Sequence, residues 1–219
     1  MKKRIWLGVP AIAVAGLLAW FGGDLLGIYR LDRYITASAA AYETDGSPWP
    51  RVSDACIGCH GARGNSLHQG YPSLAGQPAP YVAAQLHKFA SGERSDPIMG
   101  PLARTMSETE INDLAGHFAR QPAGANRYFT PDAGLLEKGK RLVASGNCAA
   151  CHGSQLIGRD QFPRLAGQGY EYLLAQFDAF ATGTRGEPTG VMKSVAAAAS
   201  PEDRKAMATY LASLAPQKP

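Results

Sequence analysis

Apolar side chains recur at helical spacing in two separate stretches of the chain. Within each stretch the intervals place the apolar positions on one face of a helix. These positions are Tyr81, Val82, Leu86 and Phe89 in the first stretch and Tyr172, Leu173, Phe177 and Phe180 in the second. No stretch shows the alternation of apolar and polar residues that is typical of a β-strand. The pattern therefore predicts an all-α fold.

Each stretch is followed by a signature for the start of another helix. Ser107-Glu-Thr-Glu110 is a capping box, and Ser200-Pro-Glu-Asp203 combines a capping serine with proline in the first turn. Apolar residues then continue at helical spacing, at Ile111, Leu114 and Phe118 after the first serine and at Met207, Tyr210, Leu211 and Leu214 after the second. Between the two halves, "QPAGANRYFTPDAG" at 121–134 has the composition of a linker.

The two halves are related by an internal repeat. Residues 71–94 align with 162–185, and residues 99–115 align with 192–208. Identical pairs include Pro72 and Pro163, Leu74 to Gln77 and Leu165 to Gln168, Tyr81 and Tyr172, Gln85 and Gln176, Phe89 and Phe180, Arg94 and Arg185, Met99 and Met192, and Ser107 and Ser200. A repeat of this length indicates a duplicated domain. We expect a first domain at residues 31–122, a linker at 123–134 and a second domain at 135–219.

The two copies differ at their beginnings. The second copy opens with "GLLEKGKRLVASG" at 134–146, which suits a helix, whereas the first has "SPWPRVSDA" at 47–55. Two prolines disfavour a long helix in the first copy. We expect the first domain either to borrow residues 33–42 as its helix or to leave a gap in which a partner contacts Trp49.

The N-terminus has the pattern of a membrane anchor. Lys2, Lys3 and Arg4 precede nineteen uncharged residues from Ile5 to Gly23, which as a helix would rise about 28 Å, close to the thickness of a bilayer's hydrocarbon core. Basic residues before the span place the N-terminus in the cytoplasm and the rest outside. We therefore expect a single transmembrane helix within residues 1–30, in the inner membrane, with the following domains in the periplasm.

A cleavable signal peptide is the alternative interpretation of this segment. Ala37-Ser38-Ala39 resembles a small-residue cleavage site. The apolar run is longer than the usual core of roughly 7–15 residues, and the candidate site lies far beyond its end. Both features favour an anchor that is retained.

The formal net charge of +4 belongs mainly to this segment. The first 30 residues carry four basic side chains and one acidic side chain, so the remainder holds 18 basic and 17 acidic side chains. The basic balance of the whole chain therefore comes from the anchor and gives no indication of nucleic-acid binding. We expect no nucleic-acid partner.

The chain has four cysteines, and all of them lie in two matching segments. "DACIGCHG" contains Cys56, Cys59 and His60, and "GNCAACHG" contains Cys148, Cys151 and His152. A zinc ribbon needs two cysteine pairs about 15–20 residues apart, and these pairs are much farther apart. A thioredoxin-like redox pair needs flanking strands, and the sequence predicts none beside these cysteines. Cysteines three apart with an adjoining histidine form the attachment motif for c-type haem. The sequence therefore predicts two covalently bound haem c groups.

The adjoining histidine of such a motif is the expected ligand on one side of the iron, so His60 and His152 take that role. Met99 and Met192 are the methionines at matched places, and thioether ligation raises the reduction potential, which suits an electron carrier. They are the expected ligands on the other side. His68, His87 and His117 are rival ligands for the first haem. They have no equivalents at the second haem, because their counterparts in the second copy are not histidines.

Two further pairs have expected supporting roles. Pro72 and Pro163 follow the two ligand histidines by twelve and eleven residues. A backbone carbonyl there would accept the ring N–H that the iron does not use, fixing the tautomer of the histidine. Arg94 and Arg185 are candidate partners of the haem propionates, although solvated surface arginines are equally common.

From about residue 50 onward the chain resembles the tandem class I cytochromes c of the cytochrome c4 type. The resemblance rests on the two Cys-x-x-Cys-His motifs, the two Pro-x-Leu-Ala-Gly-Gln segments, and Met99 and Met192 ahead of a capped final helix. It implies two all-α haem domains that pack face to face, with a short contact between propionates. It also implies one-electron transfer between a quinol-oxidising complex or dehydrogenase and a terminal oxidase. The anchor departs from the soluble members and suggests a tethered shuttle or a subunit of a membrane complex.

The main alternative function is that of a dihaem enzyme, either a peroxidase or a thiosulfate-oxidising cytochrome. Such an enzyme needs a haem with a vacant or replaceable ligand position, and Met99, between two prolines in "DPIMGP", is the weaker candidate ligand. No extra cysteine is present, and the second copy has no histidine besides His152 to build such a site. We therefore expect an electron-transfer protein without a small-molecule substrate. A permanent relay subunit of a larger oxidoreductase is also compatible with the sequence.

Overall fold

A computed structural model describes residues 16–18, 20–33, 35–36 and 52–216 of the chain. The chain divides into two units, Met1–Arg51 and Val52–Pro219, which are considered separately. The described residues of the first unit are helical. No helix in the described part of the chain is both long enough and apolar enough to cross a membrane. Most of the predicted span from Ile5 to Gly23 lies outside the described residues, as do Ala37-Ser38-Ala39 and Trp49, so the anchor remains a prediction.

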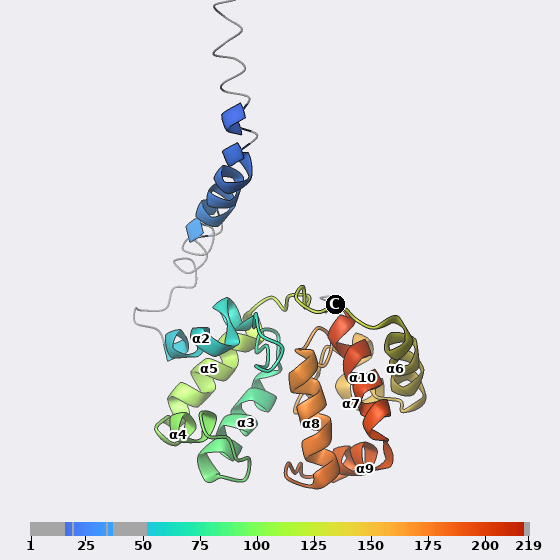
Figure 1. Ribbon diagram of the computed structural model, residues 1–219. Helices are drawn as coiled ribbons and strands as arrows, with labels where there is room; N and C mark the ends of the chain where they lie inside the picture. Colours follow the sequence, from blue (N-terminus) through green and yellow to red (C-terminus); the bar gives the residue numbers. More distant parts are fainter. Residues whose placement is uncertain (1–15, 19, 34, 37–51, 217–219) are drawn as a thin grey trace, which may run out of the picture. The chain divides into compact units, whose positions relative to one another are not determined.

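The second unit contains two successive sets of helices, coloured cyan to green and olive to red in Figure 1. The first set is η1 (Val52–Cys56), α2 (Ile57–His60), η2 (Ala62–Gly64), α3 (Ala79–Ser91), α4 (Met99–Arg104) and α5 (Glu108–Arg120). The second set is α6 (Ala133–Ser145), α7 (Ala149–His152), η3 (Ser154–Leu156), α8 (Tyr170–Thr182), α9 (Val191–Ala198) and α10 (Pro201–Ser213). An isolated bridge between Arg159 and Phe162 is the one β-type pairing among the described residues. The all-α prediction is confirmed.

The predicted capping signatures begin both final helices. At α5 the Ser107 hydroxyl accepts from the backbone N–H of Glu110, whose carboxylate accepts from the backbone N–H of Ser107. At α10 Ser200 and Asp203 make the same reciprocal pair. These contacts satisfy backbone donors that a helix start otherwise leaves without partners. The two copies therefore orient their final helices with the same local device.

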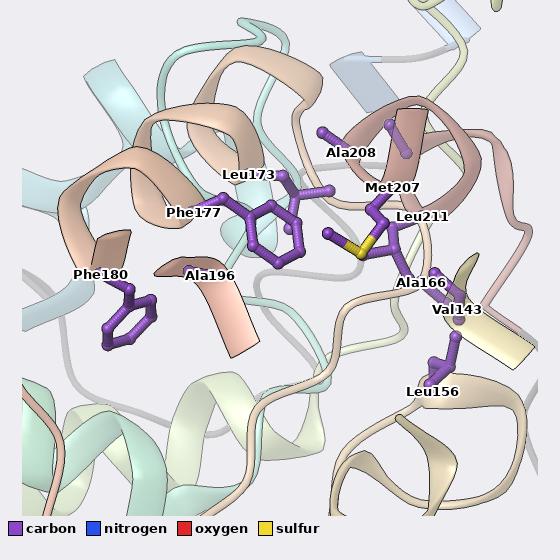
Figure 2. Packing of buried hydrophobic residues seen from close by; sticks show 11 residues of the cluster. Val143, Leu156, Ala166, Leu173, Phe177, Phe180, Ala196, Met207, Ala208 and Leu211 are labelled. Carbon is purple, nitrogen blue, oxygen red and sulfur yellow. The ribbon is translucent and has the colours of Figure 1, made fainter. Parts of the chain in front are cut away.

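Each copy has its own hydrophobic core. The first consists of Val82, Leu86, Ile111, Leu114, Ala115 and Phe118, from α3 and α5. The second consists of Val143, Leu156, Ala166, Leu173, Phe177, Phe180, Ala196, Met207, Ala208, Leu211 and Ala212, most of which are labelled in Figure 2. The predicted apolar faces of α3 and α8 supply Val82, Leu86, Phe89, Leu173, Phe177 and Phe180 to the buried set. Met207 is a core residue, because it is buried among these side chains.

The second copy opens with a helix that crosses its last helix, α6 against α10 (Figure 1). Gly139 lies at the crossing, where a Cβ atom would come 1.9 Å from the carbonyl oxygen of Ala206. Only a residue without a side chain permits this approach of the two backbones. In the first copy the described residues before the first cysteine form the short turn η1, which contacts α5.

Candidate functional site

The two Cys-x-x-Cys-His segments form short helices at equivalent places. Cys56 is the residue before α2, and Cys148 is the residue before α7, so each motif spans one helical turn. All four cysteines are free and half-buried. Burial raises the pKa of the Cys56 and Cys148 thiols. Each domain thus holds two thiols on one turn, which suits attachment to the two vinyl groups of one porphyrin.

The histidine of each motif has a fixed orientation. His60 Nδ1 lies 2.8 Å from the carbonyl oxygen of Pro72, and His152 Nδ1 lies 2.9 Å from that of Pro163. A carbonyl only accepts, so Nδ1 carries the proton and the lone pair lies on Nε2. Burial lowers the pKa of both imidazoles, although the bonds to the prolyl carbonyls oppose it. A buried neutral imidazole with a free Nε2 is suited to bind a metal.

The glycine after each histidine is required by the backbone. Gly61 has φ +76° and Gly153 has φ +80°, both in the left-handed region. A Cβ atom on Gly61 would lie 1.9 Å from the carbonyl oxygen of Asn65. The chain therefore turns sharply away from the histidine and leads back to the loop that carries the prolyl carbonyl.

The two candidate methionine ligands begin matched helices. Met99 is the first residue of α4 and Met192 the second of α9, and each is half-buried against the core of its own domain. The backbone N–H of Met99 donates to the Asp96 carboxylate at 2.7 Å, and that of Met192 donates to Glu187 at 3.0 Å. A carboxylate therefore holds the backbone of each methionine.

Glu187 is more extensively bonded than Asp96. Its carboxylate also accepts from the backbone N–H and the hydroxyl of Thr189. Burial raises the pKa of Glu187, but these bonds together with that from Met192 outweigh it and lower the pKa. The loop before Met192 is thus organised around an ionised carboxylate.

The three rival histidines make other contacts. His68 is exposed and lies edge-on to Tyr71. His87 Nε2 is 3.5 Å from a carboxylate oxygen of Glu108 at the surface. The His117 ring lies edge-on to Phe118. Among the described residues, no group of three or more His, Cys, Asp or Glu side chains is arranged to hold a metal ion.

The repeated Leu-Ala-Gly-Gln segments join the two domains. Gln168 Oε1 accepts from the backbone N–H of Ser73 at 2.6 Å, and its amide donates to the Ser73 carbonyl at 3.0 Å. Gln77 does the same with the backbone of Arg164, at 2.9 and 3.0 Å. Each glutamine thus pairs with the residue that follows the prolyl carbonyl of the other domain. The sequence revealed that these glutamines are identical, but not that they exchange partners.

Arg94 and Arg185 form a second reciprocal contact between the domains. Arg94 donates to Tyr172 Oη at 3.1 Å, and Arg185 donates to Tyr81 Oη at 3.1 Å. Both guanidinium groups also bond to Gln85 and Gln176. These tyrosine and glutamine partners carry no negative charge, so two cations lie together with neutral hydrogen-bond partners. This arrangement suits a nearby anion such as a haem propionate.

The tyrosines have a contact that the sequence did not predict. Tyr81 packs against the core of its own domain, as its place on the apolar face predicts, but the hydroxyls of Tyr81 and Tyr172 also contact the arginine of the other domain. Each guanidinium also lies over an aromatic ring of its own domain, Arg94 over Phe89 at 4.5 Å and Arg185 over Phe180 at 4.7 Å. Favourable stacking of this kind helps to hold a charge that is partly buried.

Sequence reasoning missed Asp96, Glu187 and Arg164 as residues that shape the site. Asp96 directly precedes a proline, and an Asp-Pro pair commonly starts a turn. This pair was the signal by which the sequence could have identified Asp96. Arg164 occupies the variable position of Pro-x-Leu-Ala-Gly-Gln, where its counterpart is Ser73. Nothing in the repeat distinguishes it from a surface residue, yet only 2% of it is exposed.

The fold and the site together define a tandem pair of helical haem domains of the class I cytochrome c type. Residues 51–118 and 136–215 match the Cytochrome c family, one copy in each half. The chain belongs to the cytochrome c family and is a dihaem protein like cytochrome c4, with haem c bound covalently at Cys56 and Cys59 and at Cys148 and Cys151.

Known relatives share most of this length. The chain is 34% identical over 181 residues to the thiosulfate dehydrogenase electron acceptor of Thiomonas intermedia (strain K12), covering 77% of this chain and 83% of that protein. It is similar to the crystal structure of reduced cytochrome c4 from Pseudomonas stutzeri, with a TM-score of 0.69, 29% identity, and coverage of 74% and 94%. It is also similar to part of the thiosulfate dehydrogenase of Marichromatium purpuratum, with a TM-score of 0.66, 33% identity, and coverage of 74% and 36%. The likeness to cytochrome c4 indicates an electron-transfer protein, whereas the last likeness is to part of an enzyme.

Proposed function

We propose that this cytochrome is a membrane-anchored carrier of single electrons in the periplasm. It accepts electrons from a dehydrogenase or a quinol-oxidising complex and passes them to a terminal oxidase or another acceptor. The observation that supports this most strongly is the reciprocal interface. Gln77 and Gln168 each bond to the residue that follows the proline whose carbonyl holds the histidine of the other domain. The two haem sites are therefore joined in one unit.

The residues of the chain have separate roles in this proposal. When bound, each haem supplies an iron that alternates between the ferric and ferrous states. His60 and His152 are the ligands on one side, oriented by the carbonyls of Pro72 and Pro163. Met99 and Met192 are the ligands on the other side, and a thioether raises the reduction potential. With both positions filled, no small-molecule substrate binds at the iron.

A thiosulfate dehydrogenase is the first donor to test. The support comes from the Thiomonas intermedia relative, which is named as the electron acceptor of that enzyme. In a stopped-flow experiment, ferric protein is mixed with thiosulfate and a purified thiosulfate dehydrogenase. We expect two electrons to enter each chain, measured by the haem absorption bands. A variant with Cys148 and Cys151 both replaced by serine should accept one.

Absence of any reduction by the dehydrogenase would remove this enzyme as the donor. Reduction by thiosulfate alone, without the dehydrogenase, would instead support a thiosulfate-oxidising enzyme. That alternative has one observation in its favour, the similarity to part of the Marichromatium purpuratum enzyme. It predicts a high-spin haem that binds carbon monoxide, whereas the carrier predicts two low-spin haems that do not.

The anchor and the location are tested on the full chain. Cells that mature c-type cytochromes are fractionated, and the membranes are washed with salt and then with detergent. We expect haem to remain in the membranes through the salt wash and to dissolve in detergent. A variant that begins at Ser38 behind a cleavable signal should appear in the soluble periplasmic fraction.

A further inference from the structure

Arg164 is the most deeply buried cation among the described residues. It lies in the second Pro-x-Leu-Ala-Gly-Gln segment, and only 2% of its surface is exposed. Its guanidinium donates to three backbone carbonyls, those of Ala75 at 3.1 Å, of Ser73 at 3.4 Å and of Ala166. The group therefore lies across the contact between the two domains.

None of the described residues offers a carboxylate to this charge. All three acceptors of Arg164 are neutral carbonyls, and no ion pair involves it within the described part of the chain. Burial lowers the pKa of Arg164 to about 10, and no opposing charge contributes. The guanidinium remains protonated at neutral pH, so the domain interface contains a positive charge that water screens poorly.

This charge lies beside both haem sites along the backbone. Arg164 directly follows Pro163, whose carbonyl accepts from His152. Its guanidinium also donates to Ser73, which directly follows Pro72, the partner of His60. Arg164 is therefore one residue away from Pro163 along the chain, and its guanidinium bonds to the residue next to Pro72. The carbonyls of these two prolines hold the two ligand histidines.

The asymmetry of the repeat accounts for a single arginine. Ser73 and Arg164 occupy matched positions, and the glutamine exchange brings their backbones together. A second arginine at position 73 would place two buried cations side by side, with strong repulsion. A single arginine that reaches across the contact lies near both haem sites and avoids this repulsion.

We propose that Arg164 raises the reduction potentials of both haems together by placing one shared, buried positive charge at the domain contact. Reduction adds one negative charge to each haem site. A nearby cation that solvent does not screen favours the state with the additional electron. The inference rests on the presence of two haems and is independent of which protein donates electrons.

The test replaces Arg164 with methionine or glutamine, which remove the charge, and with lysine, which keeps it. Midpoint potentials are measured by spectroelectrochemistry on the mature dihaem protein. In the two neutral variants we expect both reduction equilibria to shift toward the ferric state by about tenfold, which is 59 mV for a one-electron couple. Arg164→Lys should keep both potentials near the wild-type values, although it loses hydrogen bonds and thermal stability.

The controls separate charge from structure. Arg141 on α6 is exposed, so Arg141→Met removes the same charge at a screened position and should leave both potentials unchanged. Gln77→Leu weakens the same contact without removing a charge and should lower stability alone. Should the methionine variant fail to mature, the glutamine and lysine pair gives the comparison. A shift at one haem only, no shift, or an equal shift in the lysine variant would overturn the proposal.

Discussion

Arg94 of the first domain donates a hydrogen bond to the phenol oxygen of Tyr172 in the second domain at 3.1 Å. Arg185 and Tyr81 repeat this contact in the opposite direction. Both arginines come from the loops that follow α3 and α8, and both tyrosines come from the first turns of those helices. The contact therefore connects the helices of one domain with a loop of the other, and its loss has consequences for both.

Arg94→Met is expected to uncouple the unfolding of the two domains. Hydrogen bonds to charged groups contribute about 1.5–3 kcal/mol, and Arg94 makes two of its bonds to the other domain. Calorimetry of the wild type should show one cooperative transition, and the variant should show two. Arg104→Met, at an exposed position on α4, is the matched control. A variant that unfolds like the wild type would show that these bonds contribute little to the interface.

The tyrosine pair should titrate in an unusual range of pH. Burial raises the pKa of Tyr172, but the charges of Arg94 and Arg185 outweigh it and lower the pKa to about 8. Burial and the neighbouring Tyr172 raise the pKa of Tyr81. Ultraviolet difference absorption should therefore show one phenolate forming near pH 8, and Tyr172→Phe should abolish that step. Tyr128→Phe, at an exposed position, should leave it unchanged.

The same shift has a consequence for stability. The folded pKa of Tyr172 lies below the unfolded value of about 10. Its contribution to stability is therefore fully present above pH 10 and is lost as the pH falls through about 8. Between these values the free energy of unfolding should rise more steeply in the wild type than in Tyr172→Phe. Denaturation at several pH values measures the difference, and parallel curves for the two proteins would contradict it.

Met192→Ala is expected to leave haem attachment intact and to lower the potential of the second haem. Loss of the thioether ligand removes the group that raises the potential, and the decrease should be on the order of 0.1 V or more. Met207→Leu is the control, because Met207 is a core residue of the same domain. An unchanged potential in Met192→Ala would show that another residue is the ligand. Met99→Ala makes the equivalent test in the first domain.

Gly139→Leu should destabilise the second domain by about 3 kcal/mol or more, since overpacking at a close contact forces the backbone to move. The obstacle is the backbone carbonyl of Ala206, which cannot rotate away as a side chain can. Chemical denaturation followed by haem absorption measures the loss. Gly134→Ala, at an exposed position of the same helix, should be neutral or slightly stabilising.

Local signals in the sequence predicted the parts of this protein that depend on neighbours along the chain. The periodicity of α3 and α8, the two capping boxes and the start of α6 all follow from residues a few positions apart. The prolyl carbonyls were also identified, because the repeat places Pro72 and Pro163 at nearly equal distances from their histidines. Their contact with Nδ1 is present in both copies.

These local signals could not predict the contacts between the two copies. Gln77, Gln168, Arg94 and Arg185 were visible as identical pairs, but periodicity does not reveal that their partners lie in the other domain. Arg164 carried no signal, because burial of a charged side chain depends on tertiary structure alone. The ring of Tyr81 packs against its own core as predicted, but periodicity does not show that the hydroxyls of Tyr81 and Tyr172 reach the other domain.

The exchange between Gln77 and Gln168 also bears on the ancestry of the protein. Each glutamine satisfies the backbone donor and acceptor of a matched residue, so the exchange needs two similar halves but no connection between them. Two copies of a single-haem chain could make the same four bonds around a true twofold axis. The present arrangement is what gene fusion of such a homodimer would leave, and an isolated half would self-associate through the surface that the fusion covers.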